Sequence, residues 1–353
     1  MMNKVNLIGL SKEELREHLQ NLGEPAFRAK QIWQWVYYYG KTDFNEMTNL
    51  SIALREKLSG YFELSRPKII DEQISSDRTH KWLLEFADGE RVEMVYIPEE
   101  DRGAVCISTQ VGCAMGCKFC HTGSQKLTRN LTAGEIVSQF MVARDVYHEW
   151  NLKEQARMLS NIVVMGMGEP FCNYDNLLQA IKIISDGEGI ALSKRRITVS
   201  TSGIIPHIKD FDNECGARLA VSLHASNNEL RSEIMPINKK YPFDELLKAC
   251  RSYQDNHGGY ITFEYLMLHN LNDTPAHADE LTAVMKKYRI NAKFNLIAFN
   301  PWPGCGFEAS SNNRIHAFSL KLQKAGFAAP IRTARGQDIL AACGQLKSKK
   351  NTQ

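Results

Sequence analysis

From residue 104 onward, short apolar segments alternate with longer segments in which apolar residues recur every three or four positions. The short segments have the length and composition of buried strands. They span residues 104–109, 161–166, 196–201, 218–223, 261–268 and 293–299. The segments with helical periodicity span residues 132–147, 173–185, 227–234, 242–254, 276–288 and 313–326. This alternation predicts an α/β fold with a parallel sheet and outer helices, either an open barrel or a doubly wound sheet.

The first hundred residues follow a different pattern. Residues 1–75 are predicted to be helical, because Ser11 is a typical N-cap and Gly23 a typical helix end. Two alternating segments around Asp88 and Gly89 predict a β-hairpin. We therefore expect four parts, with the boundaries that follow: a helical domain at 1–75, a hairpin extension at 76–100, a core at 101–338 and a C-terminal segment at 339–353.

Composition and charge narrow the class of protein only slightly. The 353 residues are 43% hydrophobic and 24% charged, with a net charge of +3, which is ordinary for a globular chain and permits a nucleic-acid partner without requiring one. No apolar run could span a bilayer and no secretory signal is visible, so we expect a cytoplasmic protein without a membrane partner. In the reducing cytosol, nine cysteines favour metal binding or catalysis over disulfides.

Three of these cysteines, Cys113, Cys117 and Cys120, lie within eight residues, directly after the first core strand. A structural zinc site normally needs four ligands, and no second cysteine pair stands nearby. Inert buried cysteines are a second interpretation. A four-iron, four-sulfur cluster is a third, and with three protein thiolates it would leave one iron open to a small molecule. An open position is typical of a catalytic metal site.

The spacing Cys-x3-Cys-x2-Cys, with aromatic Phe119 before the last cysteine, resembles the cluster motif of the radical S-adenosylmethionine (SAM) enzymes. That resemblance implies a [4Fe-4S] cluster on Cys113, Cys117 and Cys120, with SAM on the open iron. "MGEP" resembles the motif that contacts the SAM amino group. Further polar or backbone groups at successive strand ends complete the expected SAM site: Gly168, Glu169, Ser200, Ser222, Leu223, His224 and Asn300.

The segments "CISTQVGCAMGCKFC", "RNLTAGEI", "SLHAS", "MPIN" and "RTARGQDILAACGQL" together resemble the RlmN and Cfr family of radical SAM RNA methyltransferases. The resemblance covers nearly the whole chain and implies a partial (β/α)6 barrel. The N-terminal segment is similar to the RlmN branch, which methylates C2 of an adenine in 23S rRNA and acts on adenine in the anticodon arm of some tRNAs. Cfr, which methylates C8, is the alternative within the family.

The resemblance also implies roles for three residues outside the cluster motif. Cys343 accepts a methyl group from one SAM, and a second SAM is cleaved to activate that methyl group. Cys106 then resolves the enzyme–RNA adduct by forming a disulfide with Cys343. Glu93 matches the base that removes the C2 proton, although on an alternating strand it could equally be an outward, solvated carboxylate. The family further implies a flavodoxin-type electron donor and a monomer.

RNA recognition requires an unpaired or extruded adenine. Candidate contacts to the RNA backbone are Lys194, Arg195, Arg196, Lys126, Arg129 and the lysines of the C-terminal tail, although such runs are usually solvated faces. The N-terminal domain resembles a helix-hairpin-helix-like accessory domain that holds RNA. A non-catalytic RNA-binding protein with a zinc site is the alternative from another class.

Overall fold

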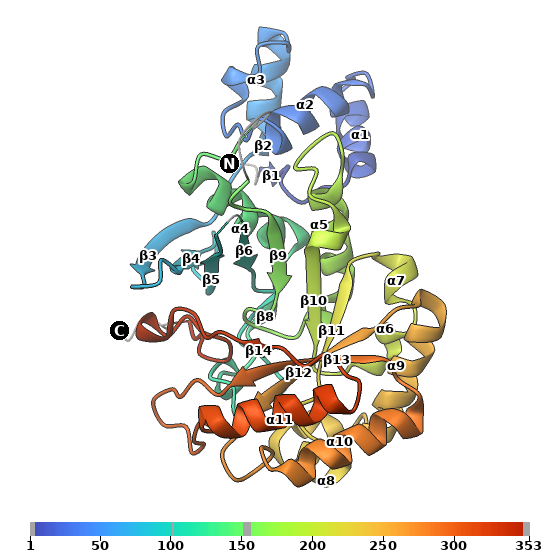
Figure 1. Cartoon of the computed structure of the whole chain (residues 1–353). Helices are drawn as coiled ribbons and strands as arrows, with labels where there is room; N and C mark the ends of the chain where they lie inside the picture. Colours follow the sequence, from blue (N-terminus) through green and yellow to red (C-terminus); the bar gives the residue numbers. More distant parts are fainter. Residues whose placement is uncertain (1–3, 101, 151–156, 349–353) are drawn as a thin grey trace.

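The structure is a computed structural model that describes residues 4–100, 102–150 and 157–348. Its centre is a sheet of ten strands in the order β14-β13-β12-β11-β10-β9-β6-β5-β4-β3 (Figure 1). The strands are β3 (Lys68–Ile74), β4 (His80–Glu85), β5 (Arg91–Pro98), β6 (Gly103–Cys106), β9 (Asn161–Val164), β10 (Ile197–Thr201), β11 (Arg218–Ser222), β12 (Ile261–Met267), β13 (Ala292–Ala298) and β14 (Ile331–Arg332).

The strand order decides between the two predicted architectures. Strands β6 and β9 to β14 are parallel. Within this set, each strand pairs with the strand that comes next along the chain. A doubly wound sheet would reverse its order at a switch point, whereas this consecutive order is that of a barrel. The sheet ends at β14 on one side and β3 on the other, so the barrel is open. The six predicted core strands are confirmed; β14, only two residues long, was not predicted.

The expected hairpin is part of the same sheet. Strand β5 pairs antiparallel with β6 and with β4, and β4 pairs antiparallel with β3. Strand β3 lies within residues 1–75, where only helices were predicted. Its sequence, KIIDEQI, alternates weakly between exposed and half-buried positions, which is why it gave no clear strand pattern.

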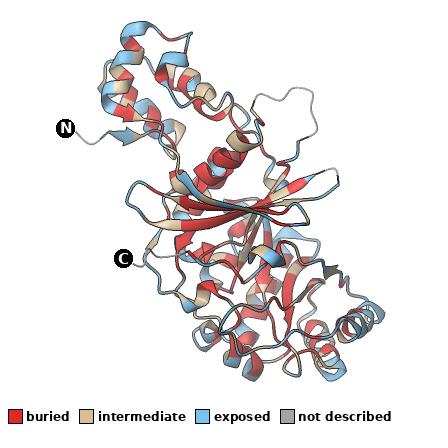
Figure 2. Ribbon diagram, turned by 90° about the vertical axis from the view of Figure 1, so that its left-hand side faces the viewer, coloured by how far each residue is buried: buried red, intermediate tan, exposed pale blue. Residues whose placement is uncertain are grey.

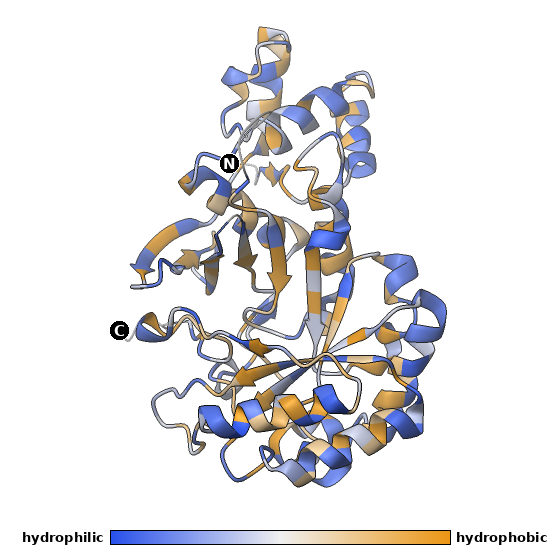
Figure 3. Cartoon of the chain, in the orientation of Figure 1, coloured by the Kyte–Doolittle hydropathy of each residue, from blue (hydrophilic) through white to orange (hydrophobic). Residues whose placement is uncertain are grey.

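Helices cover the outer side of the barrel strands (Figure 1). They are α4 (Ala133–Val146), α5 (Tyr174–Ser185), α6 (Ile205–Ile208), α7 (Phe211–Glu214), α8 (Asn228–Ile234), α9 (Phe243–His257), α10 (Pro275–Tyr288) and α11 (Asn312–Lys324). The single-turn helices α6 and α7 were not predicted. Figure 3 shows apolar strands beneath helices with mixed polar and apolar faces, and Figure 2 shows the sheet as a band of buried residues. Burial of these apolar side chains provides the main stabilisation of the core.

The N-terminal domain consists of β1 (Val5–Asn6), α1 (Lys12–Asn21), α2 (Arg28–Tyr37), α3 (Ile52–Tyr61) and β2 (Phe62–Glu63). Ser11 caps α1 as predicted, through a reciprocal capping box with Glu14. Trp33 and Tyr37 are buried, whereas Tyr39 is 39% exposed.

The N-terminal domain contacts the core where two glycines meet. A Cβ on Gly134 would lie 2.1 Å from the carbonyl oxygen of Ile8, and one on Gly9 would lie 2.5 Å from Gly134 Cα. Only glycine permits this approach. Lys12 Nζ pairs with Asp186 at 2.8 Å, beyond the end of α5. The domain is therefore fixed to the core by both packing and charge.

None of the helices in the described ranges is long and apolar enough to cross a membrane.

Candidate active site

A pocket of ≈ 600 Å³ opens at the carboxyl ends of the barrel strands and extends into the barrel. Eleven of the thirteen predicted site residues line it: Cys106, Cys113, Cys117, Cys120, Gly168, Glu169, Ser200, Ser222, His224, Asn300 and Cys343. Leu223 and Glu93 do not belong to the lining. Residues separated by up to 237 positions thus meet in one site, because parallel strands deliver their carboxyl ends to one edge.

The cysteine loop is held by a short antiparallel ladder and by tight backbone contacts. Strand β7 (Gln110–Val111) pairs with β8 (Arg129–Asn130). Gly112 has φ +77°, and a Cβ there would lie 2.1 Å from the carbonyl oxygen of Lys126. A side chain at position 112 would therefore push the two sides of the loop apart.

The three loop cysteines carry free thiols in an environment that disfavours isolated thiolates. Burial raises the pKa of Cys113 to about 12 and that of Cys117 well above its usual value. Burial also raises the pKa of Cys120. Cys113 and Cys120 each add repulsion against a thiolate at Cys117. Three mutually repelling, half-buried thiolates require a cationic partner, which is the chemistry of a thiolate-bound metal site.

Within the described residues, no three His, Cys, Asp or Glu side chains converge closely enough to hold a single metal ion. The three cysteines face one pocket from separate points of their loop. A polynuclear cluster presents several metal atoms to its ligands, so its thiolates need not converge on one point. The donor set and its spacing fit such a cluster.

Glu169 lies beside the cysteines at the end of β9. Its buried carboxylate accepts hydrogen bonds from Thr201 Oγ1 at 2.7 Å, Ser202 N at 2.7 Å and Phe171 N at 3.1 Å. Burial raises its pKa, and these donors oppose the shift. Gly168 has φ +97°, and a Cβ there would lie 2.5 Å from Gln110 Cβ. Glycine is thus needed to bring the Glu169 backbone against Gln110.

The ends of β10 and β11 add small polar groups. Ser200 Oγ and Ser222 Oγ lie 3.5 Å apart. His224 has φ +56°, and its Nδ1 accepts a hydrogen bond of 3.0 Å from Leu266 N. Burial, and secondarily the nearby Arg231, lowers the pKa of His224 to about 3. His224 is therefore neutral, with Nδ1 as an acceptor. The side chain of Leu223 is fully buried in the main core instead.

The C-terminal segment brings Cys343 to the same pocket. The side chain of Cys343 is open to the pocket, yet the surrounding protein raises its pKa, with Glu264 adding to the shift and Arg332 opposing it. Cys343 and Cys106 lie close enough that a negative charge on Cys343 raises the pKa of Cys106, whose own burial is the larger cause. Cys343 and Cys106 therefore line the same pocket and influence each other electrostatically.

Hydrogen bonds on both sides of Cys343 hold this segment in place. Asn300 Nδ2 approaches the carbonyl oxygen of Cys343 at 3.5 Å. Downstream, the carbonyl oxygen of Gly344 accepts from His121 N at 2.7 Å, and that of Leu346 accepts from Thr122 Oγ1 at 2.6 Å. Leu346 and Ser348 accept hydrogen bonds from the segment that follows Cys120, whereas residues 349–353, with Lys349 and Lys350, lie outside the described residues.

Glu93 is buried rather than solvated, being 7% exposed on β5. Its Oε1 lies 3.0 Å from Lys81 Nζ, and its Oε2 accepts a hydrogen bond of 2.7 Å from Lys347 N. Val95 pairs directly with Cys106 across β5 and β6, and Glu93 lies two residues before Val95. Glu93 and Cys106 therefore share one face of the sheet. The interpretation of Glu93 as an outward carboxylate is wrong.

Several residues of the site were not predicted from the sequence. His121 and Trp302 stack beside the cysteine loop. Arg231 is fully buried, and its guanidinium donates to Asn238 Oδ1 at 2.8 Å, Ser202 O at 2.5 Å and Ser222 O at 3.1 Å. Arg231 thereby fixes the strand ends that carry the serines. A basic residue on an amphipathic helix gives no sign of such burial, so no sequence signal identified it.

Comparison with known proteins adds the family to this geometry. Residues 5–64 match the family described as "Ribosomal RNA large subunit methyltransferase N-terminal domain", and residues 107–281 match the radical SAM superfamily. A protein of Rhodospirillum rubrum named "Dual-specificity RNA methyltransferase RlmN" is 56% identical over 346 residues, covering 98% of this chain and 80% of the relative. The chain belongs to the RlmN family. RlmN of Paramagnetospirillum magneticum is 54% identical, covering 99% of this chain and 77% of the relative.

A solved radical SAM methyltransferase from Sphaerobacter thermophilus agrees with the RlmN assignment in three dimensions. It is 42% identical and superposes with a TM-score of 0.91, covering 97% of this chain and 99% of the other. The predicted family and the partial radical SAM barrel are thereby confirmed, and the chain is a radical SAM RNA methyltransferase. This family implies a [4Fe-4S] cluster and SAM as cofactors and RNA as substrate.

Proposed function

We propose that this protein methylates C2 of a specific adenine in 23S rRNA and of adenine in the anticodon arm of some tRNAs. The observation that carries the proposal is the meeting of Cys343 and Cys106 with the three loop cysteines in one pocket. A radical SAM enzyme without a methyl-accepting thiol would need no cysteine from the C-terminal segment. The names of the RlmN relatives support the two classes of RNA.

Cys113, Cys117 and Cys120 would hold the [4Fe-4S] cluster as its three protein ligands. Glu169, Ser200, Ser222, His224 and Asn300 would orient SAM, with Gly168 and Leu223 contributing backbone. Glu169 carries a buried carboxylate near the loop cysteines, so it suits an ammonium group. When bound, the cluster and SAM supply a methyl group and a carbon radical that can remove hydrogen from an unactivated methyl group.

Cys343 Sγ is the nucleophile of the first stage. The thiol loses its proton, and the thiolate forms a bond to the methyl carbon of one SAM as the sulfonium–methyl bond breaks. Arg332 favours the thiolate, whereas burial and Glu264 oppose it. Because His224 is neutral, it provides no positive charge that would stabilise the thiolate. The radical that a second SAM would supply when bound would remove one hydrogen atom from the methyl group on Cys343. The carbon of that group would then bond to adenine C2, and the surplus electron would return to the cluster.

Cys106 and Glu93 complete the second stage. Glu93 takes the C2 proton from the adduct. Cys106 loses its thiol proton and attacks the sulfur of Cys343, which forms a disulfide as the carbon–sulfur bond breaks. The electron pair of that bond stays with the base, and its carbon gains one proton to become the methyl group of the freed base. Because Glu93 binds Lys347 N and does not line the pocket, its carboxylate must release this contact when RNA enters.

The remaining parts of the proposal concern partners and organisation. The N-terminal domain, within residues 1–75, holds the RNA, and the hairpin at 76–100 and the core at 101–338 present the catalytic groups. A flavodoxin-type protein supplies the electrons, and the enzyme acts as a monomer in the cytoplasm. The segment 339–353 acts as the carrier of the methyl-accepting cysteine.

Anaerobic incubation of the reconstituted protein with SAM, a reductant and an rRNA or tRNA fragment tests the proposal. Mass analysis of the nucleosides should show 2-methyladenosine. 8-Methyladenosine as the sole product would assign the C8 reaction instead. Metal analysis that returned zinc and no iron from oxygen-free material would overturn the cluster assignment.

A further inference from the structure

A second concave site lies at the opposite edge of the sheet from the active site. It is lined by five arginines, together with small polar and apolar residues, and its described lining contains neither Asp nor Glu. The arginines are Arg102, Arg157, Arg195, Arg196 and Arg218. We call these five residues the arginine site.

The barrel topology assembles the arginine site from four neighbouring strands. Arg102 precedes β6, Arg157 precedes β9, Arg196 precedes β10, and Arg218 is the first residue of β11. These strands are parallel neighbours, so their amino ends meet at one edge. Arg218 lines both this site and the inner end of the active-site pocket. Apart from the adjacent Arg195 and Arg196, the arginines are distant in sequence, and the fold brings them together.

Among the described residues, the arginine site has few carboxylate partners. In the part of the chain that the structure describes, only Arg102 has a carboxylate partner, Glu99. Arg196 donates a hydrogen bond of 3.3 Å to the carbonyl oxygen of Ser160, which leaves its charge unneutralised. All five side chains are exposed. Like charges gathered in a concavity repel one another and attract anions, so the site is built to accept negative charge.

We propose that the arginine site binds phosphates of the substrate RNA backbone, at a part of the RNA remote from the methylated adenine. The inference rests on the proposed function for its choice of RNA as the anion. Guanidinium groups match phosphate oxygens in a bidentate geometry that lysine cannot reproduce. The described lining holds no aromatic side chain on which a base could stack. The site therefore positions the RNA and does not read its sequence.

The position of the N-terminal domain supports a continuous RNA-binding surface. Ala191 and Leu192 line the arginine site, and the preceding segment contacts the N-terminal domain. Trp33 Nε1 donates to Asp186 Oδ1 at 3.2 Å, and a Cβ on Gly189 would lie 2.8 Å from Tyr37 Cβ. An RNA held by the N-terminal domain thus has the arginine site beside it.

The test measures how tightly variants of the full-length protein bind two RNAs of different length. Arg195→Ala/Arg196→Ala and Arg157→Ala are measured for binding to a whole tRNA and to a short hairpin that carries only the target adenine and its loop. The double variant should bind the whole tRNA about tenfold more weakly, with a salt dependence reduced by roughly one phosphate contact per arginine. Its affinity for the short hairpin should stay within about twofold of the wild type, because this RNA ends before the site.

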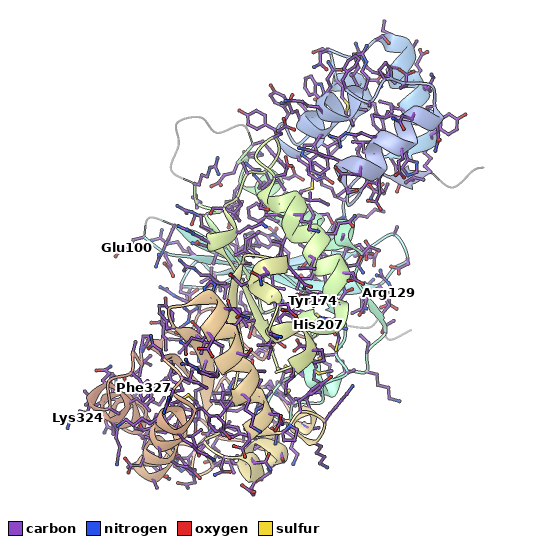
Figure 4. The ribbon with its side chains drawn as sticks, turned by 90° about the vertical axis from the view of Figure 1, so that its right-hand side faces the viewer. Glu100, Arg129, Tyr174, His207, Lys324 and Phe327 are labelled. Atoms are coloured by element: carbon purple, nitrogen blue, oxygen red, sulfur yellow. The ribbon has the colours of Figure 1, made fainter. Side chains whose placement is uncertain are left out.

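Two controls separate this proposal from the proposed function and from a structural role. Lys324→Ala removes a positive charge from the end of α11, far from the arginine site. Figure 4 shows this distance, because it labels Lys324 and also Glu100, which lies two residues before Arg102. This control should bind both RNAs normally. Methylation of Cys343 by SAM without RNA should be unchanged in every variant, and its loss in the wild type would refute the proposed function alone.

Unchanged affinity of the double variant and of Arg157→Ala for whole tRNA would overturn the proposal. A lower melting temperature with unchanged affinity would also overturn it, by assigning the arginines to stability. Weaker binding of the double variant that is equal for the hairpin and the tRNA would place the contact near the adenine and contradict the remote location. A selective loss of tRNA affinity would support it.

Discussion

The imidazole of His121 stacks on the indole of Trp302, with ring centroids 4.5 Å apart and planes 6° from parallel. The pair joins three segments of the site. His121 N and Nδ1 contact the carbonyl oxygens of Gly344 and Gln345, and Trp302 Nε1 donates to Phe119 O at 3.0 Å. The loop that carries Cys120 is thereby tied to the segment that carries Cys343.

Removing the His121 ring should loosen the C-terminal segment. His121→Ala loses the stack and the contact with Gln345, and we expect it to lower the free energy of unfolding by roughly 1–2 kcal/mol. Hydrogen exchange should report faster exchange at residues 344–348, and alkylation of Cys343 should accelerate. His207→Ala is the matched control, because His207 stacks on Tyr174 at 3.9 Å away from this segment (Figure 4). Equal Cys343 alkylation in both variants would contradict the coupling.

The buried His224 should make stability depend on pH in the acid range. Its folded pKa of about 3 lies below its value of about 6.5 in the unfolded chain, so between these values the unfolded state binds more protons. Its contribution is fully present above pH 6.5 and is lost as pH falls toward 3, by about 1.4 kcal/mol per pH unit.

His224→Asn is the variant that isolates this effect. Asparagine tolerates the positive φ of residue 224 and can offer its side-chain oxygen to Leu266 N. Denaturant unfolding between pH 7 and pH 4 should show a shallower loss of stability in the variant. Parallel curves for the two proteins would show that His224 does not titrate as its burial requires.

Cys106→Ala should trap the enzyme on its RNA. Without the thiol that attacks Cys343, we expect a protein–RNA adduct to accumulate, visible as a shifted band on a denaturing gel. Cys305→Ala is the control, because Cys305 does not line the described pocket. Normal turnover and a clean gel would remove Cys106 from the mechanism.

Glu93→Gln should separate the two stages of the reaction. Glutamine keeps an oxygen for Lys347 N but is not a base, so methylation of Cys343 should stay within about twofold of the wild type. Formation of methylated RNA should fall by roughly 10²- to 10⁴-fold, the usual range for loss of a general base. Mass spectrometry of the Cys343 peptide and of the nucleosides measures the two stages separately. Product formation at the normal rate would exclude Glu93 as the base.

The hydrophobic pattern predicted a parallel sheet with outer helices, because each core strand is a compact apolar run beside an amphipathic helix. The choice of a barrel over a doubly wound sheet came only from the resemblance to the radical SAM family. The pattern did not predict β14, since two residues carry no periodicity, or β3, whose solvent-facing side weakens its pattern. The sequence identified the cysteines because their spacing is local. The burial of Glu93 and Arg231 depends on partners far along the chain, such as Lys347 and Ser202, which no local pattern reveals.

The anchors of the C-terminal segment have a practical consequence for preparing the protein. The bonds to His121, Thr122, Gln125 and Glu93 are made by residues 344–348, immediately after the nucleophile. Truncation of the polypeptide directly after Cys343 would keep the thiol but remove the residues that make these hydrogen bonds. A purification tag should therefore be placed at the amino terminus. Digestion of the carboxyl terminus by a carboxypeptidase during storage should abolish activity before the protein unfolds.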